Sequence, residues 1–262
     1  SAPAIRSRVR ALQEALQGLN AGIRYAVKAN GTLAVLQLLA EQGAGADIVS
    51  AGELQRALRA GIAACDIVFS GVGKTDAEIG MALAAGVGRF NLESRAELDA
   101  VQRIAAARGC MATASVRINP DVDAQTHAKI STGKAENKFG VAISEARAWF
   151  DAHTTWPNVQ LDGLHMHIGS QLLSLAPVAE AVQRMATFWQ QLVVAGHSIA
   201  SLDVGGGLGV RYREGEHAPA ARDYADILRT AFAGFDGRIL VEPGRWLVAE
   251  AGVLLSRVVL VK

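Results

Sequence analysis

The sequence predicts an α/β fold in which eight parallel strands and their covering helices close into a (β/α)8 TIM barrel. Short runs of β-branched and apolar residues alternate with longer Ala- and Leu-rich amphipathic runs along the whole chain. Eight such units follow one another without a long break, which favours a closed barrel over an open doubly wound sheet. The length of 262 residues matches the roughly 250 residues that such barrels usually need.

The strands and helices are predicted from these runs, in chain order. The predicted strands are Ile23–Lys28, Ala46–Val49, Ile67–Ser70, Arg89–Leu92, Thr113–Asn119, Gln160–His167, Ser201–Val204 and Arg238–Glu242. The predicted helices include Ala4–Gln17, Leu33–Gln42, Ala51–Ala60, Asp76–Ala85, Arg95–Arg108 and Val178–Ala195. Ser50 and Ser94 each precede a helix and have Glu three positions later, as in a capping box. Glycines that end helices in a left-handed conformation are expected at Gly43, Gly61, Gly86 and Gly109.

Two segments depart from this alternation. Residues 120–140 are polar and loop-like, and they follow the fifth strand, so we expect them on the carboxyl face, where barrel enzymes place their chemistry. Residues 1–250 are predicted to form the barrel. Residues 251–262 are predicted to form an exit strand toward a second domain that this sequence does not contain.

Composition narrows the class of protein. The formal net charge is +1 and Lys and Arg form no dense run, so we expect neither nucleic acid nor an anionic membrane as a partner. No apolar stretch reaches the roughly 18 residues that span a bilayer, and the first ten residues do not resemble a signal peptide. A cytoplasmic protein that acts on a small molecule is therefore expected.

Lys28 ends the first predicted strand. A single lysine there is usually a solvent-facing group. The functional alternative is a Schiff-base lysine, whose partial burial would lower its pKa and leave a nucleophilic amine near neutral pH.

His165 and His167 lie two residues apart on the sixth strand, so both side chains point to the same side. Three interpretations are open: a pair of zinc ligands, a ring that stacks on a flat cofactor, or two hydrogen-bonded core histidines. In zinc-dependent barrel hydrolases the His pair ends strand one and a lysine follows. Here the lysine comes first, which counts against zinc.

Glycines follow the seventh strand at Gly205, Gly206, Gly207 and Gly209. Consecutive glycines let backbone N–H groups surround an anion, and a phosphate site after strand seven recurs in barrels. The spacing does not match a dinucleotide fingerprint, and a tight turn is the alternative interpretation.

Charged residues also end other strands. Glu242 precedes Pro243, Gly244 and Arg245, and its partner is either Arg245 or a cationic ligand group. Asp47 and Arg117 are charges on otherwise apolar strands. Because all these residues sit at carboxyl ends of strands, we predict that they converge on one site.

Long motifs support a specific resemblance. The segments that carry it are Tyr25–Asn30 (YAVKAN), His165–Gln171 (HMHIGSQ), Asp203–Gly207 (DVGGG) and Glu242–Arg245 (EPGR). Together they resemble the alanine-racemase-like barrel of the amino-acid decarboxylases that depend on pyridoxal 5'-phosphate (PLP). Further segments look like the diaminopimelate decarboxylase family, namely Ser70–Thr75, Asn119–His127 and Ile130–Gly140.

This resemblance implies roles for individual residues. Lys28 would hold PLP as a Schiff base, His167 would stack on its ring, and Glu242 would pair with the pyridinium nitrogen. Asp47 and Arg117 would support this network, and Arg245 would also help to orient the substrate. Phosphate contacts would come from Ser170, Gly205, Gly206, Gly207, Pro243, Gly244 and Arg245. A glutamate at the ring nitrogen favours decarboxylation over racemisation, because racemases of this fold have an arginine there.

The resemblance therefore implies an enzyme, a lyase of lysine biosynthesis that converts meso-diaminopimelate to L-lysine and is a homodimer in its full-length form. Relatives continue into a β-domain that supplies a cysteine, a tyrosine and substrate ligands, so we expect the barrel alone to be impaired. Two alternatives are a PLP-binding barrel without catalysis and a decarboxylase of the ornithine or arginine type.

Overall fold

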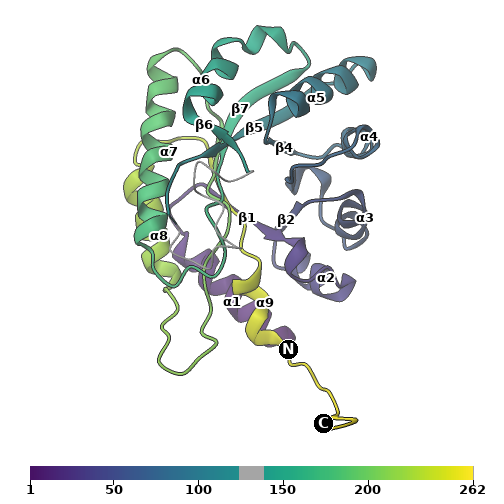
Figure 1. Ribbon diagram of the computed structural model, residues 1–262, viewed down its shortest axis with the longest axis vertical. Helices are drawn as coiled ribbons and strands as arrows, with labels where there is room; N and C mark the ends of the chain where they lie inside the picture. Colours follow the sequence, from purple (N-terminus) through teal and green to yellow (C-terminus); the bar gives the residue numbers. More distant parts are fainter. Residues whose placement is uncertain (124–138, 262) are drawn as a thin grey trace.

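Eight parallel strands close into a barrel in the computed structural model, which describes residues 1–123 and 139–261 (Figure 1). Their order is β4-β3-β2-β1-β9-β8-β7-β5, and pairing between β4 and β5 completes the ring. The strands of the wall are β1 (Ala21–Ala26), β2 (Gly45–Ile48), β3 (Ile67–Phe69), β4 (Arg89–Leu92), β5 (Ala112–Asn119), β7 (Val159–His165), β8 (Ser201–Asp203) and β9 (Arg238–Val241). The predicted (β/α)8 barrel is thus confirmed. A further two-residue strand, β6 (Val141–Ala142), pairs with the end of β5 and was not predicted.

Helices lie around the outside of the strands (Figure 1). The α-helices of the described residues are α1 (Ala2–Ala15), α2 (Leu33–Glu41), α3 (Ala51–Arg59), α4 (Asp76–Ala85), α5 (Arg95–Ala107), α6 (Ile143–Asp151), α7 (Ala176–Val194), α8 (Ala221–Ala231) and α9 (Arg245–Val248). Short 3-10 turns are η1 (Val27–Ala29), η2 (Ala64–Asp66), η3 (His153–Thr155) and η4 (Ala249–Ala251). Helix α1 packs against both α2 and α8, so it completes the ring between the first and last units.

Helix ends follow the predicted signals in part. The Ser50 and Ser94 hydroxyls accept the N–H of the residue three positions later, as expected. The carboxylates of Glu53 and Glu97, however, accept the N–H of the residue before each serine, at 2.7 Å, so neither pair forms a reciprocal capping box. The glycines predicted to end helices (Gly43, Gly61, Gly86 and Gly109) all have positive φ.

Two polar pairs lie toward the amino end of the barrel, and in one of them Asp66 is partly exposed. Arg89 contacts Asp162 across the interior at 2.6 Å, and Arg24 contacts Asp66 at 2.7 Å. Tyr25 is fully buried between the strands and the surrounding helices, because Ala26, the next residue on β1, faces the barrel interior. As is usual for this fold, room for a ligand is left at the carboxyl ends of the strands.

Several strands end earlier than predicted. Strand β1 stops at Ala26, so Lys28 lies in turn η1, while His167 and Glu242 lie two residues and one residue beyond β7 and β9. The apolar pattern continues past the point where hydrogen bonding between neighbouring strands stops. Lys28, His167 and Glu242 therefore sit in the loops at the barrel mouth, whereas Asp47 and Arg117 lie within β2 and β5.

The exit strand expected for residues 251–262 stays a prediction. Residues 252–261 have no assigned secondary structure and extend from the barrel, with side chains such as Leu254 and Val261 almost fully exposed (Figure 1). A strand needs a hydrogen-bonding neighbour, and no described strand pairs with this segment.

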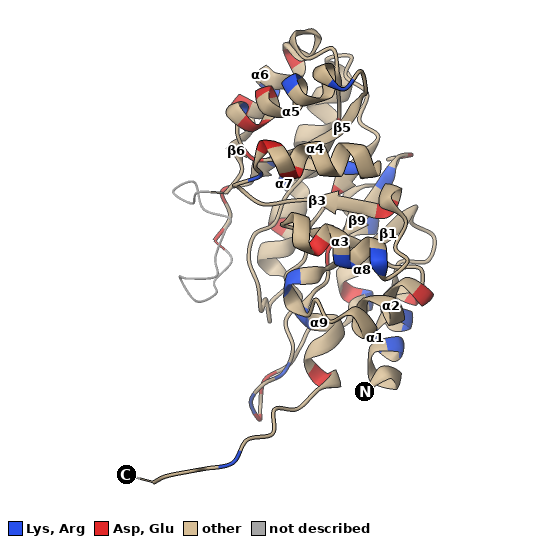
Figure 2. Ribbon diagram, turned by 90° about the vertical axis from the view of Figure 1, so that its right-hand side faces the viewer, with Lys and Arg blue, Asp and Glu red and all other residues tan. Residues whose placement is uncertain are grey.

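Positions of Lys and Arg alternate with those of Asp and Glu along the ribbon in Figure 2, in keeping with the near-zero net charge. Among the described residues, no helix has the length and apolarity needed to cross a membrane.

Candidate active site

A cavity of about 500 Å³ opens at the carboxyl ends of β1, β7, β8 and β9. Of the residues predicted from the sequence, those that line it are Lys28, His167, Ser170, Gly207, Glu242, Pro243, Gly244 and Arg245. Three further predicted residues are hydrogen-bonded to residues of the lining. Asp47 accepts from Lys28 Nζ, the Gly205 carbonyl accepts from the Glu242 N–H, and the Gly206 N–H donates to His167. The predicted convergence of residues from separate strands is thus seen in the structure.

Lys28 reaches the cavity from turn η1 and contacts a buried carboxylate. Its Nζ donates to Asp47 Oδ2 at 3.1 Å; the lysine side chain is 52% exposed and that of Asp47 is 0% exposed. The Asp47 carboxylate raises the pKa of Lys28 and outweighs the opposing effect of burial. The expectation of a lowered pKa is therefore wrong for this structure, because the ammonium gains an anionic partner.

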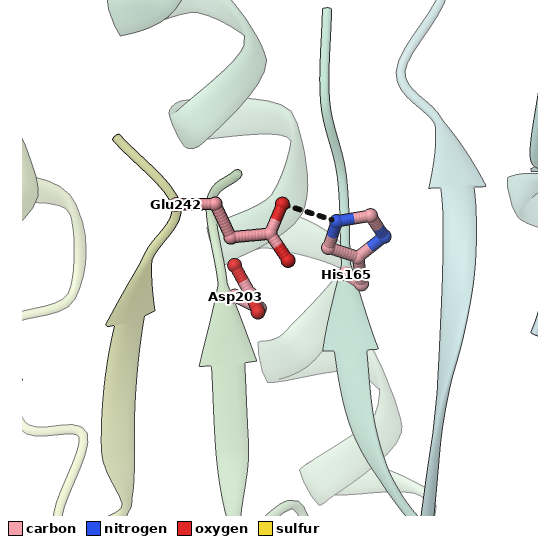
Figure 3. A group of neighbouring side chains, drawn as sticks. All are labelled: His165, Asp203 and Glu242. Atoms are coloured by element: carbon pink, nitrogen blue, oxygen red, sulfur yellow. Dashed lines mark hydrogen bonds and ion pairs between the residues drawn. The ribbon is translucent and has the colours of Figure 1, made fainter. Parts of the chain in front are cut away.

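Glu242 lies on the cavity wall at the end of β9 and is almost fully buried. Figure 3 shows its side chain meeting those of Asp203 and His165, which come from the ends of β8 and β7. Its Oε2 lies 3.3 Å from His165 Nε2, and its Oε1 accepts from Asn91 Nδ2 at 3.3 Å. The interpretation of Arg245 as its partner is wrong, because the Arg245 guanidinium turns to Tyr212 instead.

Burial is the main cause of the shifted pKa values of Glu242, Asp203 and His165. It raises the pKa of Glu242 to about 8, with the Asp47 carboxylate adding to the effect. It also raises the pKa of Asp203 well above the ordinary value, helped by Glu242. It lowers the pKa of His165 to about 4, so this imidazole is neutral at physiological pH. Two neighbouring buried carboxylates would repel each other, so the carboxyl groups of Glu242 and Asp203 retain protons at neutral pH.

His165, Asp203 and Glu242 also place possible ligand atoms within 4.8 Å of one another. Several of these atoms already have hydrogen-bond partners. Asp203 Oδ1 accepts the Gly205 N–H at 2.9 Å, and both Glu242 oxygens face Asn91 or His165. We therefore interpret the cluster as a hydrogen-bonded support for Glu242.

His167 has its tautomer set by the glycine segment after β8. The Gly206 N–H donates to His167 Nδ1 at 3.2 Å, so a neutral ring carries its proton on Nε2. Burial lowers the pKa of His167 well below the ordinary value, and the neighbouring charges of Lys28 and Arg117 lower it further. A neutral, fixed ring therefore faces the cavity.

The three glycines differ in what their N–H groups do. Those of Gly205 and Gly206 donate to Asp203 and His167, whereas no acceptor for the Gly207 N–H is recorded among the described residues. A Cβ on Gly206 would lie 2.1 Å from the Glu242 carbonyl oxygen, so only glycine fits at that position. The segment thus holds His167 and Glu242 close together and turns Gly207 toward the cavity.

Arg117 does not line the cavity. It is buried beside it and donates to Glu93 Oε1 at 2.9 Å, while its guanidinium lies 4.8 Å from the centre of the Phe139 ring. Glu93 also accepts the N–H groups of Gly71 and Gly140. Arg117 and Glu93 thus tie together the loops after β3 and β5. Residues 124–138 of the predicted functional loop lie outside the described residues.

Sequence reasoning missed three residues of this site. Asn91 bridges Ser70 Oγ and Glu242, Glu93 pairs with Arg117, and the Tyr212 hydroxyl accepts from Arg245 Nη1 at 3.0 Å. Asn91 and Glu93 interrupt or follow an apolar strand, as Asp47 and Arg117 do, so the same signal could have identified them. Tyr212 follows a glycine-rich loop and gave no such signal.

The site can be compared with known proteins. The family profile described as "Pyridoxal-dependent decarboxylase, pyridoxal binding domain" matches residues 3–249. The chain belongs to this family. The match spans every strand of the barrel and all the residues that line the cavity, so the pyridoxal binding domain accounts for the whole site.

Individual relatives agree with this assignment. The diaminopimelate decarboxylase of Zymomonas mobilis is 44% identical over 97% of this chain and 62% of its own length. That of Pseudomonas aeruginosa is 49% identical over 97% of this chain and 61% of its own length. The chain therefore spans less than two thirds of the length of these relatives.

A solved structure gives the same result. The crystal structure of diaminopimelate decarboxylase from Helicobacter pylori complexed with L-lysine superposes with a TM-score of 0.93 at 45% identity. The superposition covers 95% of this chain and 63% of that one. The barrel is thus similar in both sequence and backbone to a domain of that decarboxylase.

PLP is the cofactor that this pyridoxal binding domain implies, and the residues present fit it. Glu242 is a buried carboxylate whose contacts are with Asn91, His165 and Asp203, and among the described residues no Lys or Arg forms an ion pair with it. A pyridinium N–H would give the Glu242 carboxylate a cationic hydrogen-bond donor. The Lys28 amine and the Gly207 N–H on the same cavity suit an aldehyde carbon and a phosphate group.

Proposed function

We propose that the protein containing this chain decarboxylates meso-diaminopimelate to L-lysine, with PLP held in the barrel. The observation that carries the proposal is one cavity that joins Lys28 to Glu242 in a pyridoxal binding domain. The names of the relatives support the substrate, and the Helicobacter pylori structure contains L-lysine, the expected product. The proposal includes a cytoplasmic location and a homodimer in the full-length protein.

PLP, when bound, supplies an electron sink for the electron pair left by the departing carboxylate. Lys28 would hold the aldehyde carbon of PLP through its Nζ. Asp47, 3.1 Å away, stabilises the ammonium form, so that proton must leave before the amine can act as a nucleophile. Asp47 is suited to keep the amine at the cavity wall during this exchange.

Glu242 would pair with the ring nitrogen. Asn91 and His165 fix the position of its two oxygens, and the neutral His165 adds no competing charge. An anionic carboxylate here stabilises a protonated ring nitrogen, which strengthens electron withdrawal from the substrate. Because burial raises the pKa of Glu242 to about 8, this carboxyl group is mostly protonated at neutral pH in the cofactor-free protein, and a cation beside it would favour the ionised form.

The other residues would bind and orient. Ser170, the Gly207 N–H and the backbone of Gly244 and Arg245 are proposed to hold the phosphate. His167 would lie against the ring, with its tautomer set by the Gly206 N–H and its neutral form favoured by burial. The Arg245 side chain, held by Tyr212, would help to place a carboxylate of the substrate.

The test uses the full-length protein with PLP and its Lys28→Ala variant. We expect a visible absorbance band that survives desalting, a borohydride-stable adduct on Lys28, and neither of these in the variant. We also expect lysine and CO2 to form from meso-diaminopimelate, and at least a hundredfold slower turnover of ornithine and arginine.

Each outcome has a meaning. Absence of the band and the adduct in the wild-type protein refutes the assigned site. A band without turnover of any of the three amino acids supports the barrel that binds PLP without catalysis. Faster turnover of ornithine or arginine moves the assignment to that type of decarboxylase. A monomeric mass in solution for the active full-length protein refutes the homodimer.

A further inference from the structure

Two loops at the barrel mouth are joined by one side chain. Gln171, in the loop between β7 and α7, pairs its amide with the backbone of Val210, in the loop between β8 and α8. Its Nε2 donates to the Val210 carbonyl at 2.5 Å, and its Oε1 accepts the Val210 N–H at 3.2 Å. A side-chain amide that satisfies both backbone groups of one residue fixes position and orientation together.

The backbone strengthens this connection. The Leu172 N–H donates to the Gly207 carbonyl at 2.9 Å, and the Gly209 N–H donates to the Leu172 carbonyl at 3.0 Å. A Cβ on Gly207 would lie 2.6 Å from the Gly169 carbonyl oxygen, and one on Gly209 would lie 2.8 Å from that of Leu172. The two backbones are therefore in direct contact and leave no room for side chains between them.

Gln171 adopts an unfavourable backbone conformation to make this connection. Its φ is +60°, and among the described residues only Asp121 is another non-glycine with positive φ. Such a conformation costs energy and persists only where the surroundings impose it, most often at functional sites. Glycine would adopt this φ without strain but has no side chain to reach Val210.

The joined segments carry residues of the cavity. Ser170 directly precedes Gln171, and Gly207 lies three residues before Val210; both line the cavity. Tyr212 lies two residues after Val210, lines the same cavity and holds Arg245. A shift of one loop relative to the other would therefore move the groups assigned to the phosphate and to the Arg245 side chain.

We propose that Gln171 is a positioning residue whose amide clasps the two loops and thereby sets the phosphate-binding end of the cavity. This inference rests on the proposed function, because that function assigns the phosphate to Ser170 and Gly207. Both loops also contribute buried core residues, namely Leu172, Leu208 and Val210, so the test has to separate ligand affinity from overall stability.

The experiment compares PLP with pyridoxal, which lacks the phosphate, in full-length protein carrying Gln171→Glu or Gln171→Gly. The first variant keeps the shape but loses the donor to the Val210 carbonyl. The second removes the backbone strain together with the clasp. Loss of two hydrogen bonds predicts a rise of about tenfold in the Kd for PLP. Borohydride trapping of pyridoxal on Lys28 should change by less than twofold.

Gln183→Glu, an exposed change on α7, is the matched control and should leave both ligands unaffected. Equal weakening of PLP and pyridoxal would overturn the proposal, because it would indicate a general loss of structure. Wild-type affinity in Gln171→Gly would also overturn it, because the clasp would then be dispensable. If the wild-type protein fails to form the Lys28 adduct at all, the proposed function fails instead.

Discussion

Replacing Glu242 by Gln should stabilise the cofactor-free protein at alkaline pH while it weakens PLP binding. Glu242 is 4% exposed, and burial raises its pKa from 4.5 to about 8. Between these two values the folded state holds a proton that the unfolded chain has lost. Stability therefore falls as pH rises through this window, and the loss is complete above about pH 8.

The size of the effect follows from that interval. At about 1.4 kcal/mol for each pH unit, the interval between 4.5 and about 8 corresponds to roughly 5 kcal/mol of unfolding free energy. A neutral glutamine does not titrate and retains an oxygen that accepts from Asn91. For a domain of this size, a loss of several kcal/mol lowers Tm on the order of 10 °C.

The assay is thermal unfolding of the cofactor-free full-length protein and its Glu242→Gln variant at pH 5 and pH 8.5. We expect the difference in Tm between variant and wild type to increase in favour of the variant at pH 8.5. Other titrating groups cancel in this comparison because both proteins contain them. Glu41→Gln, a change at an exposed ion pair, should show no such increase.

A Tm difference that is equal at the two pH values would refute the assignment of a buried, protonated Glu242. Added PLP provides the second half of the test. Bound cofactor should stabilise the wild-type protein more than the variant, because only the carboxylate can pair with a pyridinium N–H.

Three other changes test the rest of the site and its support. Asp47→Asn should lower the pKa of Lys28, so half-maximal rate of adduct formation moves to lower pH; an unchanged profile would contradict the role of this ion pair. Lys74→Met should cost about 3–5 kcal/mol in chemical denaturation, because it leaves the buried Glu97 carboxylate without its cation. Gly205→Ala should lower the free energy of unfolding of the protein more than Gly61→Ala does. Both glycines have positive φ, but only at Gly205 would the Cβ lie against a carbonyl oxygen, at 2.4 Å; equal losses in urea denaturation would contradict this.

Much of the fold could be predicted because it depends on local patterns. The alternation of apolar strands with amphipathic helices gives the eight units, and helix-ending glycines such as Gly61 and Gly86 mark their boundaries. In a parallel barrel every strand ends at the same face, so residues such as Lys28, His167 and Glu242 had to lie near one another.

The partners of those residues could not be predicted, because they depend on tertiary structure. Asn91 and Glu242 are 151 positions apart, and their contact requires closure of the barrel and a particular rotamer of each side chain. Arg245 is three residues from Glu242, yet it turns to Tyr212. Likewise, the pKa of Lys28 depends on the balance between burial and the Asp47 carboxylate, which no strand pattern contains. The sequence by itself determined which residues gather at the barrel mouth, and only the tertiary structure decided which of them share protons and charge.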